Sequence, residues 1–205
     1  ADGPYWATCN VGAAKPEDFG LYFWWGDTVG YRYLNSKWEA VTSSTTIEFL
    51  ESATPANSTY NKTVDALITA GYLDSNSNLV SACDAATAHL GAPWRMPTDA
   101  EFQKLVDTSC CTATWMDNWN GTGVSGRLFT GKGAYESKSI FLPAVGWATA
   151  STREGTPQSG YYWSSTPDSS NSKIARDLGF GTSAYSRTNG RFIGFAVRPV
   201  RSCAK

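Results

Sequence analysis

The chain has 205 residues, of which 17% are charged and 14% aromatic, and its formal net charge is −1. This balance excludes a basic surface of the kind that holds a nucleic-acid backbone or an anionic membrane. No apolar run reaches the length of a membrane span, and the many glycines, prolines and aromatic residues fit an ordered, loop-rich domain. We therefore expect a single domain over residues 1–205.

The N-terminal 38 residues are aromatic and glycine-rich, and "GLYFWWGDTVGYRY" predicts strand and turn. The opening "ADGPYWATCNVG" lacks the pattern of a signal peptide, so we expect a domain of a longer or processed precursor. Residues 39–80 are rich in Ser, Thr and Asn. They predict a surface insertion with a short helix around Val64 to Ala70.

Two helices are predicted in the middle of the chain. "LVSACDAATAHL" carries apolar residues at helical spacing, and Gly91 would end this helix. "PTDAEFQKLVD" opens with Thr98 and has Glu101 three residues later, which is the pattern of a capping box. The predicted apolar face of the first helix consists of Leu79, Ala82, Cys83, Ala86 and Leu90.

After Cys110 the pattern returns to short strands and turns. Helices in the middle and strands at both ends predict an α+β architecture in which the two chain ends lie together in one sheet. The predicted strands lie in "GRLFTGKG", "SIFLPAVGWA", "GYYWSST", "ARDLGF" and "FIGFAVRPV".

Motifs for catalysis are absent from the sequence. His89 is the one histidine, and a surface or hydrogen-bonded histidine is the favoured interpretation. No nucleophile elbow, phosphate-binding loop or dinucleotide fingerprint occurs. The oxygen-rich "DSSNS" at 168–172 could bind calcium, but a hydrated loop is favoured. We expect no enzyme activity and no cofactor, with calcium left open.

Five cysteines occur, and none forms a CxxC pair. Small buried thiols are the favoured interpretation, and one or two disulfides in an exported protein is the alternative. Adjacent cysteines could bond to each other only under strain. The five are Cys9, Cys83, Cys110, Cys111 and Cys203.

Nine tryptophans would form sticky patches if all were exposed, so we expect most of them in the core. A frame stabilised in this way can carry long irregular loops.

Five blocks in order resemble the Fibrobacter succinogenes major paralogous domain family: "WATCNVGA…PEDFGLYFWWGD", "GAPWRMPTDAEFQKL", "IFLPAVGW", "YYWSST" and "GFAVRPV". That family is similar to the C-type-lectin-like variable proteins of diversity-generating retroelements of gut bacteria and bacteriophages. The resemblance spans most of the chain, and residues 39–80 fit it less well. It implies a C-type-lectin-like fold, with small twisted, mainly antiparallel sheets, two flanking helices and long loops.

The resemblance also implies that the C-terminal segment, 161–193, is a sequence-variable binding surface. Adenine-directed mutagenesis of Asn-type codons cannot produce Lys, Glu, Gln, Met or Trp, and positions 174–193 contain none of these. Leu178 and Phe180 would then point inward, in alternation with outward Asp177 and Gly179. Trp163, Phe195 and Val197 would be buried in the fixed segments on either side. The candidate exposed, ligand-binding positions are Tyr161, Asp168, Ser170, Ile174, Arg176, Asp177, Gly179, Gly181, Ser183, Ala184, Tyr185, Arg187, Arg191, Phe192 and Ile193.

Tyr and Arg dominate binding surfaces, and Ser, Gly and Asn supply adaptable contacts. We therefore expect a receptor- or adhesin-type domain, displayed on a bacterial cell surface or a phage particle, that binds a protein or glycan on another cell. The partners would include no nucleic acid, and this segment would not insert into a membrane. A structural surface or pilus component without diversification is the alternative. An oxidase similar to formylglycine-generating enzymes is disfavoured, because Cys203 has no second cysteine nearby.

Overall fold

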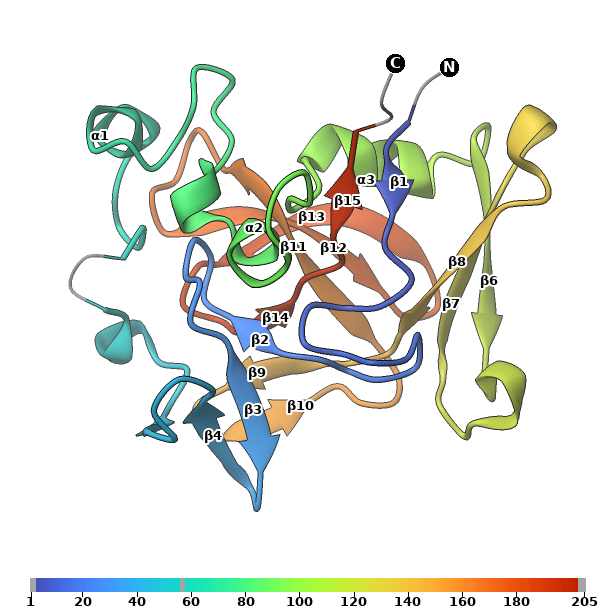
Figure 1. The fold of residues 1–205 in the computed structure, drawn as a ribbon, viewed down its shortest axis with the longest axis horizontal. Helices are drawn as coiled ribbons and strands as arrows, with labels where there is room; N and C mark the ends of the chain where they lie inside the picture. The colour runs from blue at the N-terminus through green and yellow to red at the C-terminus, as the bar shows by residue number, and fades with distance from the viewer. Residues whose placement is uncertain (1–2, 56–57, 203–205) are drawn as a thin grey trace.

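The computed structural model describes residues 3–55 and 58–202, and it is an α+β domain. Its main sheet has eight strands in the order β13-β12-β11-β14-β2-β3-β4-β5 (Figure 1). Neighbouring strands are antiparallel except for the pair β11 and β14, which is parallel. In sequence order these strands are β2 (Tyr22–Phe23), β3 (Tyr31–Leu34), β4 (Lys37–Ala40), β5 (Thr46–Ile47), β11 (Gly160–Pro167), β12 (Ile174–Phe180), β13 (Ala184–Gly190) and β14 (Phe195–Ala196).

Three smaller sheets complete the fold. An antiparallel sheet stands at the right of Figure 1 and consists of β6 (Cys111–Met116), β7 (Gly126–Gly131) and β8 (Ser139–Pro143). A short hairpin joins β9 (Trp147–Thr149) to β10 (Thr152–Glu154). The last pair consists of β1 (Tyr5–Trp6) and β15 (Val200–Arg201).

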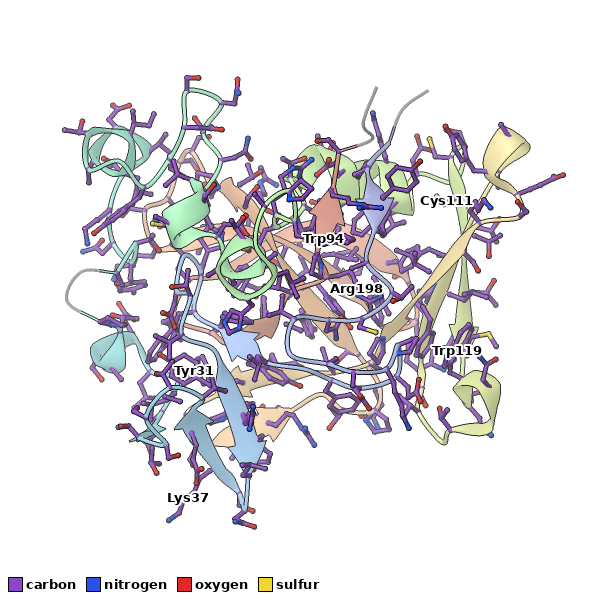
Figure 2. The ribbon with its side chains drawn as sticks, in the orientation of Figure 1. Tyr31, Lys37, Trp94, Cys111, Trp119 and Arg198 are labelled. Carbon is purple, nitrogen blue, oxygen red and sulfur yellow. The ribbon has the colours of Figure 1, made fainter. Side chains whose placement is uncertain are left out.

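The first strand and the last strand lie side by side, as predicted for the two ends of the chain (Figure 1). β1 pairs with β15 in a sheet of their own, with Trp6 opposite Val200. Arg198, in the interior in Figure 2, stabilises this junction. Its Nε donates to Asn10 Oδ1 at 2.8 Å, and its Nη1 donates to the carbonyl oxygens of Ala7 and Thr8 at 3.0 and 2.8 Å. A fully buried guanidinium therefore connects the last segment of the chain to the first.

The helices agree with the sequence prediction in position, and one is shorter than expected. α1 (Val64–Thr69) begins after Thr63, whose side chain accepts from the amide of Ala66. α3 (Asp99–Val106) has the predicted capping box between Thr98 and Glu101. The predicted helix over residues 79–90 is wrong in its first half. A 3₁₀ turn, η2 (Ser81–Cys83), comes first, and Asp84 then caps a separate α2 (Ala85–Leu90) that ends at Gly91.

Three further 3₁₀ turns lie in the connections: η1 (Glu51–Ala53), η3 (Trp119–Gly121) and η4 (Gly133–Tyr135). Trp119 of η3 stacks on Phe141 with ring centroids 4.4 Å apart, which packs this turn against β8. In the part of the chain that the structure describes, no helix is long and apolar enough to cross a bilayer.

Both faces of the main sheet are covered by apolar side chains. Alternate residues of one segment enter two different clusters: Tyr22 and Trp24 belong to one, and Phe23 and Trp25 to the other. Four tryptophans are buried and the other five are half-buried, so the expected core role holds fully for Trp24, Trp25, Trp38 and Trp163. Phe195 and Val197 are buried as predicted.

Most described residues of 39–80 are exposed or half-buried, as predicted for a surface region, but a few apolar side chains fix the segment to the core. β4 and β5 extend the main sheet, and Phe49 is fully buried. The Phe49 ring lies 5.1 to 5.4 Å from the rings of Trp24, Tyr31 and Trp38. This segment also contributes Leu67, Leu73 and Leu79 to the second cluster. Sparse apolar residues among many Ser and Thr are enough to anchor it.

The four cysteines that the structure describes carry free thiols. Cys110 is exposed, and Cys9, Cys83 and Cys111 are half-buried, which fits the favoured prediction of small thiols only in part. Burial raises the pKa of the Cys83 and Cys111 thiols. Cys203 lies outside the described residues.

Candidate ligand-binding site

The polar middle of the C-terminal segment is a regular β-hairpin. β12 pairs with β13 without interruption from Ile174 opposite Gly190 to Phe180 opposite Ala184. The sequence predicted a strand in "ARDLGF" and none over residues 182–191, so β13 is a strand that sequence reasoning missed. Its composition, "AYSRTNG", lacks the apolar alternation that marks a half-buried strand.

The inner face of this hairpin is part of the core. Leu178 and Phe180 are buried there, as predicted, and Phe180 stacks on Tyr162 with ring centroids 5.9 Å apart. α3 packs against β11, β12 and β13, and Ser186 Oγ hydrogen-bonds to Asp99 Oδ1 of α3. The inner face therefore fixes the hairpin against the rest of the domain.

The opposite face is hollowed. A depression of about 290 Å³ lies between β9, β11, β13 and the loop that leads into β14. Aromatic and aliphatic side chains form most of its wall, and one arginine and one asparagine supply polar groups. Its lining residues are Trp147, Tyr161, Arg187, Asn189, Ile193 and Phe195.

Arg187 is the charged group of the hollow, and its side chain is 29% exposed. The guanidinium lies over two rings, 4.9 Å from the centre of Tyr161 and 5.6 Å from that of Tyr185. Nη1 donates to the Tyr185 hydroxyl and Nη2 to Asn189 Oδ1, both at 3.3 Å. Stacking and hydrogen bonds thus hold the charge in one place, as a preformed polar group in an apolar wall.

The expectation that Asp177 and Gly179 are exposed is wrong, although both lie on the predicted side of the strand. The stem of Arg187 covers Gly179: a Cβ built there would lie 2.7 Å from Arg187 Cδ. Asp177 is 0% exposed beneath the same side chain, and its Oδ2 lies 3.8 Å from Arg187 Nε. The outward strand face is therefore a second layer under the side chains of β13.

Burial dominates the acidity of Asp177. Loss of water raises the pKa of its carboxyl to about 7, against the opposing effects of the Asn189 hydrogen bond and the Arg187 charge. Asn189 Nδ2 donates to Oδ1 at 2.9 Å. Oδ2 has no hydrogen-bond partner among the described residues. A titratable group therefore lies directly below the charged wall of the hollow.

Arg191 is not the exposed binding residue that its neighbourhood predicted. It is 1% exposed, and its guanidinium lies 4.6 Å from the centre of the Trp25 ring. Nη1 donates to the carbonyl oxygens of Thr59 and Lys62 at 2.8 and 3.0 Å, and Nε donates to that of Ile174 at 2.9 Å. Burial lowers its pKa to about 10, so it remains charged at neutral pH. Its role is to fix residues 59–62 to the sheet.

The prediction that Asp168 is exposed is also wrong, because the residue is 9% exposed and stabilises its own loop. Its Oδ1 accepts from the amides of Ser170 and Asn171 and from the Ser170 hydroxyl, at 2.6 to 3.0 Å. These bonds occupy one of the two carboxylate oxygens that could bind calcium in the "DSSNS" loop, and the other lies 3.8 Å from Arg176 Nη2. Among residues 3–55 and 58–202, no three His, Cys, Asp or Glu side chains gather as a metal site.

The remaining candidate positions divide between the two ends of the hairpin. Gly181, Ser183, Ala184 and Tyr185 lie at the turn end, where Tyr185 is 44% exposed and the Gly181 carbonyl accepts from Arg127 Nη2 at 2.6 Å. Away from the hollow lie the exposed Ser170 and the half-buried Ile174, Arg176 and Phe192. Arg176 Nη2 is 3.8 Å from Asp168 Oδ2, and Phe192 packs edge-on against Tyr60 with centroids 6.0 Å apart.

Three lining residues of the hollow were missed. Trp147 lies in the block "IFLPAVGW", outside the C-terminal segment, and its ring meets that of Tyr161 edge-on at 5.1 Å. Phe195 was assigned to the core and also forms the floor, stacked at 5.2 Å on Tyr161. Asn189 carried a usable signal: it is two residues from Arg187 in what proves to be a strand, so both side chains share a face.

His89 is solvent-exposed and hydrogen-bonded, as predicted: Nε2 lies 3.0 Å from the Thr28 carbonyl oxygen. Its ring also packs edge-on against Phe23, with centroids 5.5 Å apart. These contacts place His89 beside β2 of the main sheet and not at the hollow.

Comparison of the chain with protein-family models, with curated proteins and with solved structures finds no match.

Proposed function

We propose that this chain is a non-enzymatic ligand-binding domain of the receptor or adhesin type. Its binding surface is the outer face of the β12–β13 hairpin together with Tyr161 of β11. One observation carries the proposal: Tyr161 and Arg187 line one hollow and Tyr185 contacts Arg187 beside it, while the reverse face of the same strands is anchored in the core. Tyr and Arg are enriched among the residues that dominate binding energy.

The hollow is suited to part of a larger ligand. Sites for drug-sized molecules enclose roughly 300–1,000 Å³, and this one encloses about 290 Å³. It accommodates one ring or one side chain, and Tyr185 at the rim adds exposed contact area. The partner that fits this geometry is a protein or a glycan on another cell, and the domain acts at a bacterial cell surface or on a phage particle.

The five sequence blocks that resemble the Fibrobacter succinogenes major paralogous domain family support this function, and they also support a C-type-lectin-like fold. Paired chain ends and a C-terminal hairpin that carries the binding face agree with that fold. On the same grounds we propose that codons of the hairpin are diversified by a retroelement. The positions free to vary are then fewer than the segment 161–193: they are the solvent-facing residues around Ser183, Tyr185 and Arg187.

The test is loss of binding without loss of fold. The fluorescently labelled domain is applied to a glycan array and to a panel of intact gut-bacterial cells. The double variant Tyr185→Ala/Arg187→Ala should lose at least tenfold in bound signal, because it removes both anchors of the surface. Measurements at pH 6 keep Asp177 protonated, so that removal of its neighbouring cation does not leave a buried charge.

A matched control removes the same residue types elsewhere. Tyr135→Ala/Arg32→Ala takes away a tyrosine of similar exposure, 46% against 44%, and an exposed arginine of β3. This control should bind as the wild type does, and all variants should melt within a few degrees of it. Equal loss of binding in both double variants, or unfolding of the first at pH 6, would contradict the proposal.

A further inference from the structure

We propose that the hollow binds a carboxylate carried on an apolar or ring-shaped body, that this carboxylate pairs with Arg187, and that binding is coupled to protonation of Asp177. This inference rests on the proposed function, because it names the ligand chemistry and the pH control of the same site.

The polar half of the recognition comes from Arg187. A guanidinium has five N–H donors in a planar fork, and two of them make the long hydrogen bonds to Tyr185 and Asn189. The guanidinium lies against two tyrosine rings, and 29% of the Arg187 side chain is exposed. A carboxylate accepts from such a fork through two parallel hydrogen bonds, which is the strongest pairing available to arginine.

The apolar half comes from the rest of the wall. Trp147, Tyr161, Ile193 and Phe195 surround the arginine, and none of the described residues that line the hollow carries a negative charge. A ligand that places its carboxylate at Arg187 would therefore have the adjoining atoms against aromatic and aliphatic surface. This favours a ring or an aliphatic chain next to the acid over a bare inorganic anion, which would leave that surface exposed to water.

The coupling arises from the carboxyl group below. Asp177 is fully buried, and the ionisable groups whose charges act on it are Arg187 of β13, Arg176 of its own strand and Asp99 of α3. The two arginines favour its charged form, and Asp99 and burial favour its neutral form. A ligand carboxylate at Arg187 adds a second negative charge and competes for the same cation. Asp177 therefore takes up a proton when such a ligand binds.

The direction of the pH effect follows from this competition. Asp177 has a pKa of about 7, so its neutral fraction falls roughly tenfold between pH 6 and pH 8. If the protonated form is the one that binds, the apparent dissociation constant rises by the same factor. Ligand carboxylates with a pKa of about 4 are ionised throughout this range, so they contribute no pH dependence of their own.

The experiment titrates the isotope-labelled domain with sodium benzoate and with benzamide, its neutral counterpart, and follows backbone amide signals by NMR at pH 6 and pH 8. Benzoate should shift the signals of Tyr161, Gly179 and Arg187, and should bind up to about tenfold more tightly at pH 6. Benzamide should bind more weakly at pH 6 and equally at both pH values. Equal affinity for the two probes, shifts elsewhere only, or no saturable benzoate binding at either pH would overturn the proposal.

Two variants separate the effect of the Arg187 charge from the effect of the Asp177 proton on ligand binding. Arg187→Gln should abolish the preference for benzoate over benzamide, and Asp177→Asn should retain benzoate binding and lose its pH dependence. Arg32→Gln is the matched control and should behave as the wild type. Persistence of the pH dependence in Asp177→Asn would overturn the coupling. If Arg187→Gln fails to fold, the two probes and two pH values still decide the question on the wild-type protein.

Two natural sources of the carboxylate are distinguished by further probes. Tighter binding of methyl glucuronide identifies an acidic sugar, and tighter binding of acetyl-phenylalaninate identifies a peptide. Absence of binding by both would overturn the proposed ligand class. The inference and the proposed function fail separately: without benzoate binding, cell binding that is sensitive to Tyr185→Ala/Arg187→Ala still supports the function. Cell binding that is insensitive to that variant contradicts the function even where benzoate binds.

Discussion

Arg187 and Arg191 are four residues apart, in the same polar stretch, and have opposite roles. Arg187 is in a strand, with its guanidinium at the edge of a hollow and 29% of its side chain exposed. Arg191 follows the end of that strand, is 1% exposed and donates to three backbone carbonyls. Arginine in a polar stretch is typical of a binding surface. At one of these two nearby positions, however, it is a structural residue of the core.

The difference has a physical cause in what covers each side chain. Residues 59–62 bring two carbonyl oxygens to Arg191, and the Trp25 ring lies against the guanidinium. Among the described residues, no backbone carbonyl accepts from Arg187, which lies on the edge strand β13 against the rings of Tyr161 and Tyr185. The proposed binding surface is therefore the part of the hairpin that residues 39–80 leave uncovered.

The largest effect that tests this comparison is expected from Arg191→Met, which keeps an apolar stem and removes the guanidinium. Three carbonyl oxygens lose a charged donor, and hydrogen bonds to charged groups contribute about 1.5–3 kcal/mol each. We expect the free energy of unfolding in urea to fall by about 3 kcal/mol or more. Arg32→Met, at an exposed position of β3, serves as the control and should change it by less than about 0.5 kcal/mol. Similar values for the two variants would contradict the structural role.

A pH-dependent effect is expected at Asp177. Its folded-state pKa of about 7 lies above the unfolded value of 3.8, so the folded state binds more protons between these two pH values. The contribution to stability is complete below about pH 4 and is lost as the pH rises through 7, with a slope of at most about 1.4 kcal/mol per pH unit. Above pH 7 it is constant.

Asp177→Asn isolates this contribution, because other carboxyl groups titrate in both proteins. The difference in free energy of unfolding between wild type and variant, measured in urea from pH 4 to pH 8, should move in favour of the variant and level off near pH 7. A difference that is flat over this range would show that Asp177 is not the buried acid described.

Much of the fold could be predicted because the decisive signals are local. The capping box at Thr98 and Glu101 and the stop at Gly91 depend on hydrogen bonds and backbone angles within one turn. The inward positions of Leu178 and Phe180 follow from strand alternation alone. The α+β class and the paired chain ends follow from the order of such elements.

The errors share a different cause, since they concern residues whose environment comes from distant parts of the chain. Phe49 is buried by the rings of Trp24, Tyr31 and Trp38. Asp177 is covered by Arg187 from the next strand. Alternation identified the side of β12 on which Asp177 lies, but could not reveal a second layer above it. Trp147 is likewise brought to the hollow by a separate hairpin.

The central claim is that the hairpin separates positions that must be kept from positions free to vary, and saturation mutagenesis of residues 174–193 tests it most directly. The library is displayed on yeast and sorted for protease resistance, so that only folding is selected. Because Tyr185 is 44% exposed and Arg191 is 1% exposed, Tyr185 should accept most residue types and Arg191 almost none. Equal tolerance at the two positions, or greater tolerance at Arg191, would contradict the account.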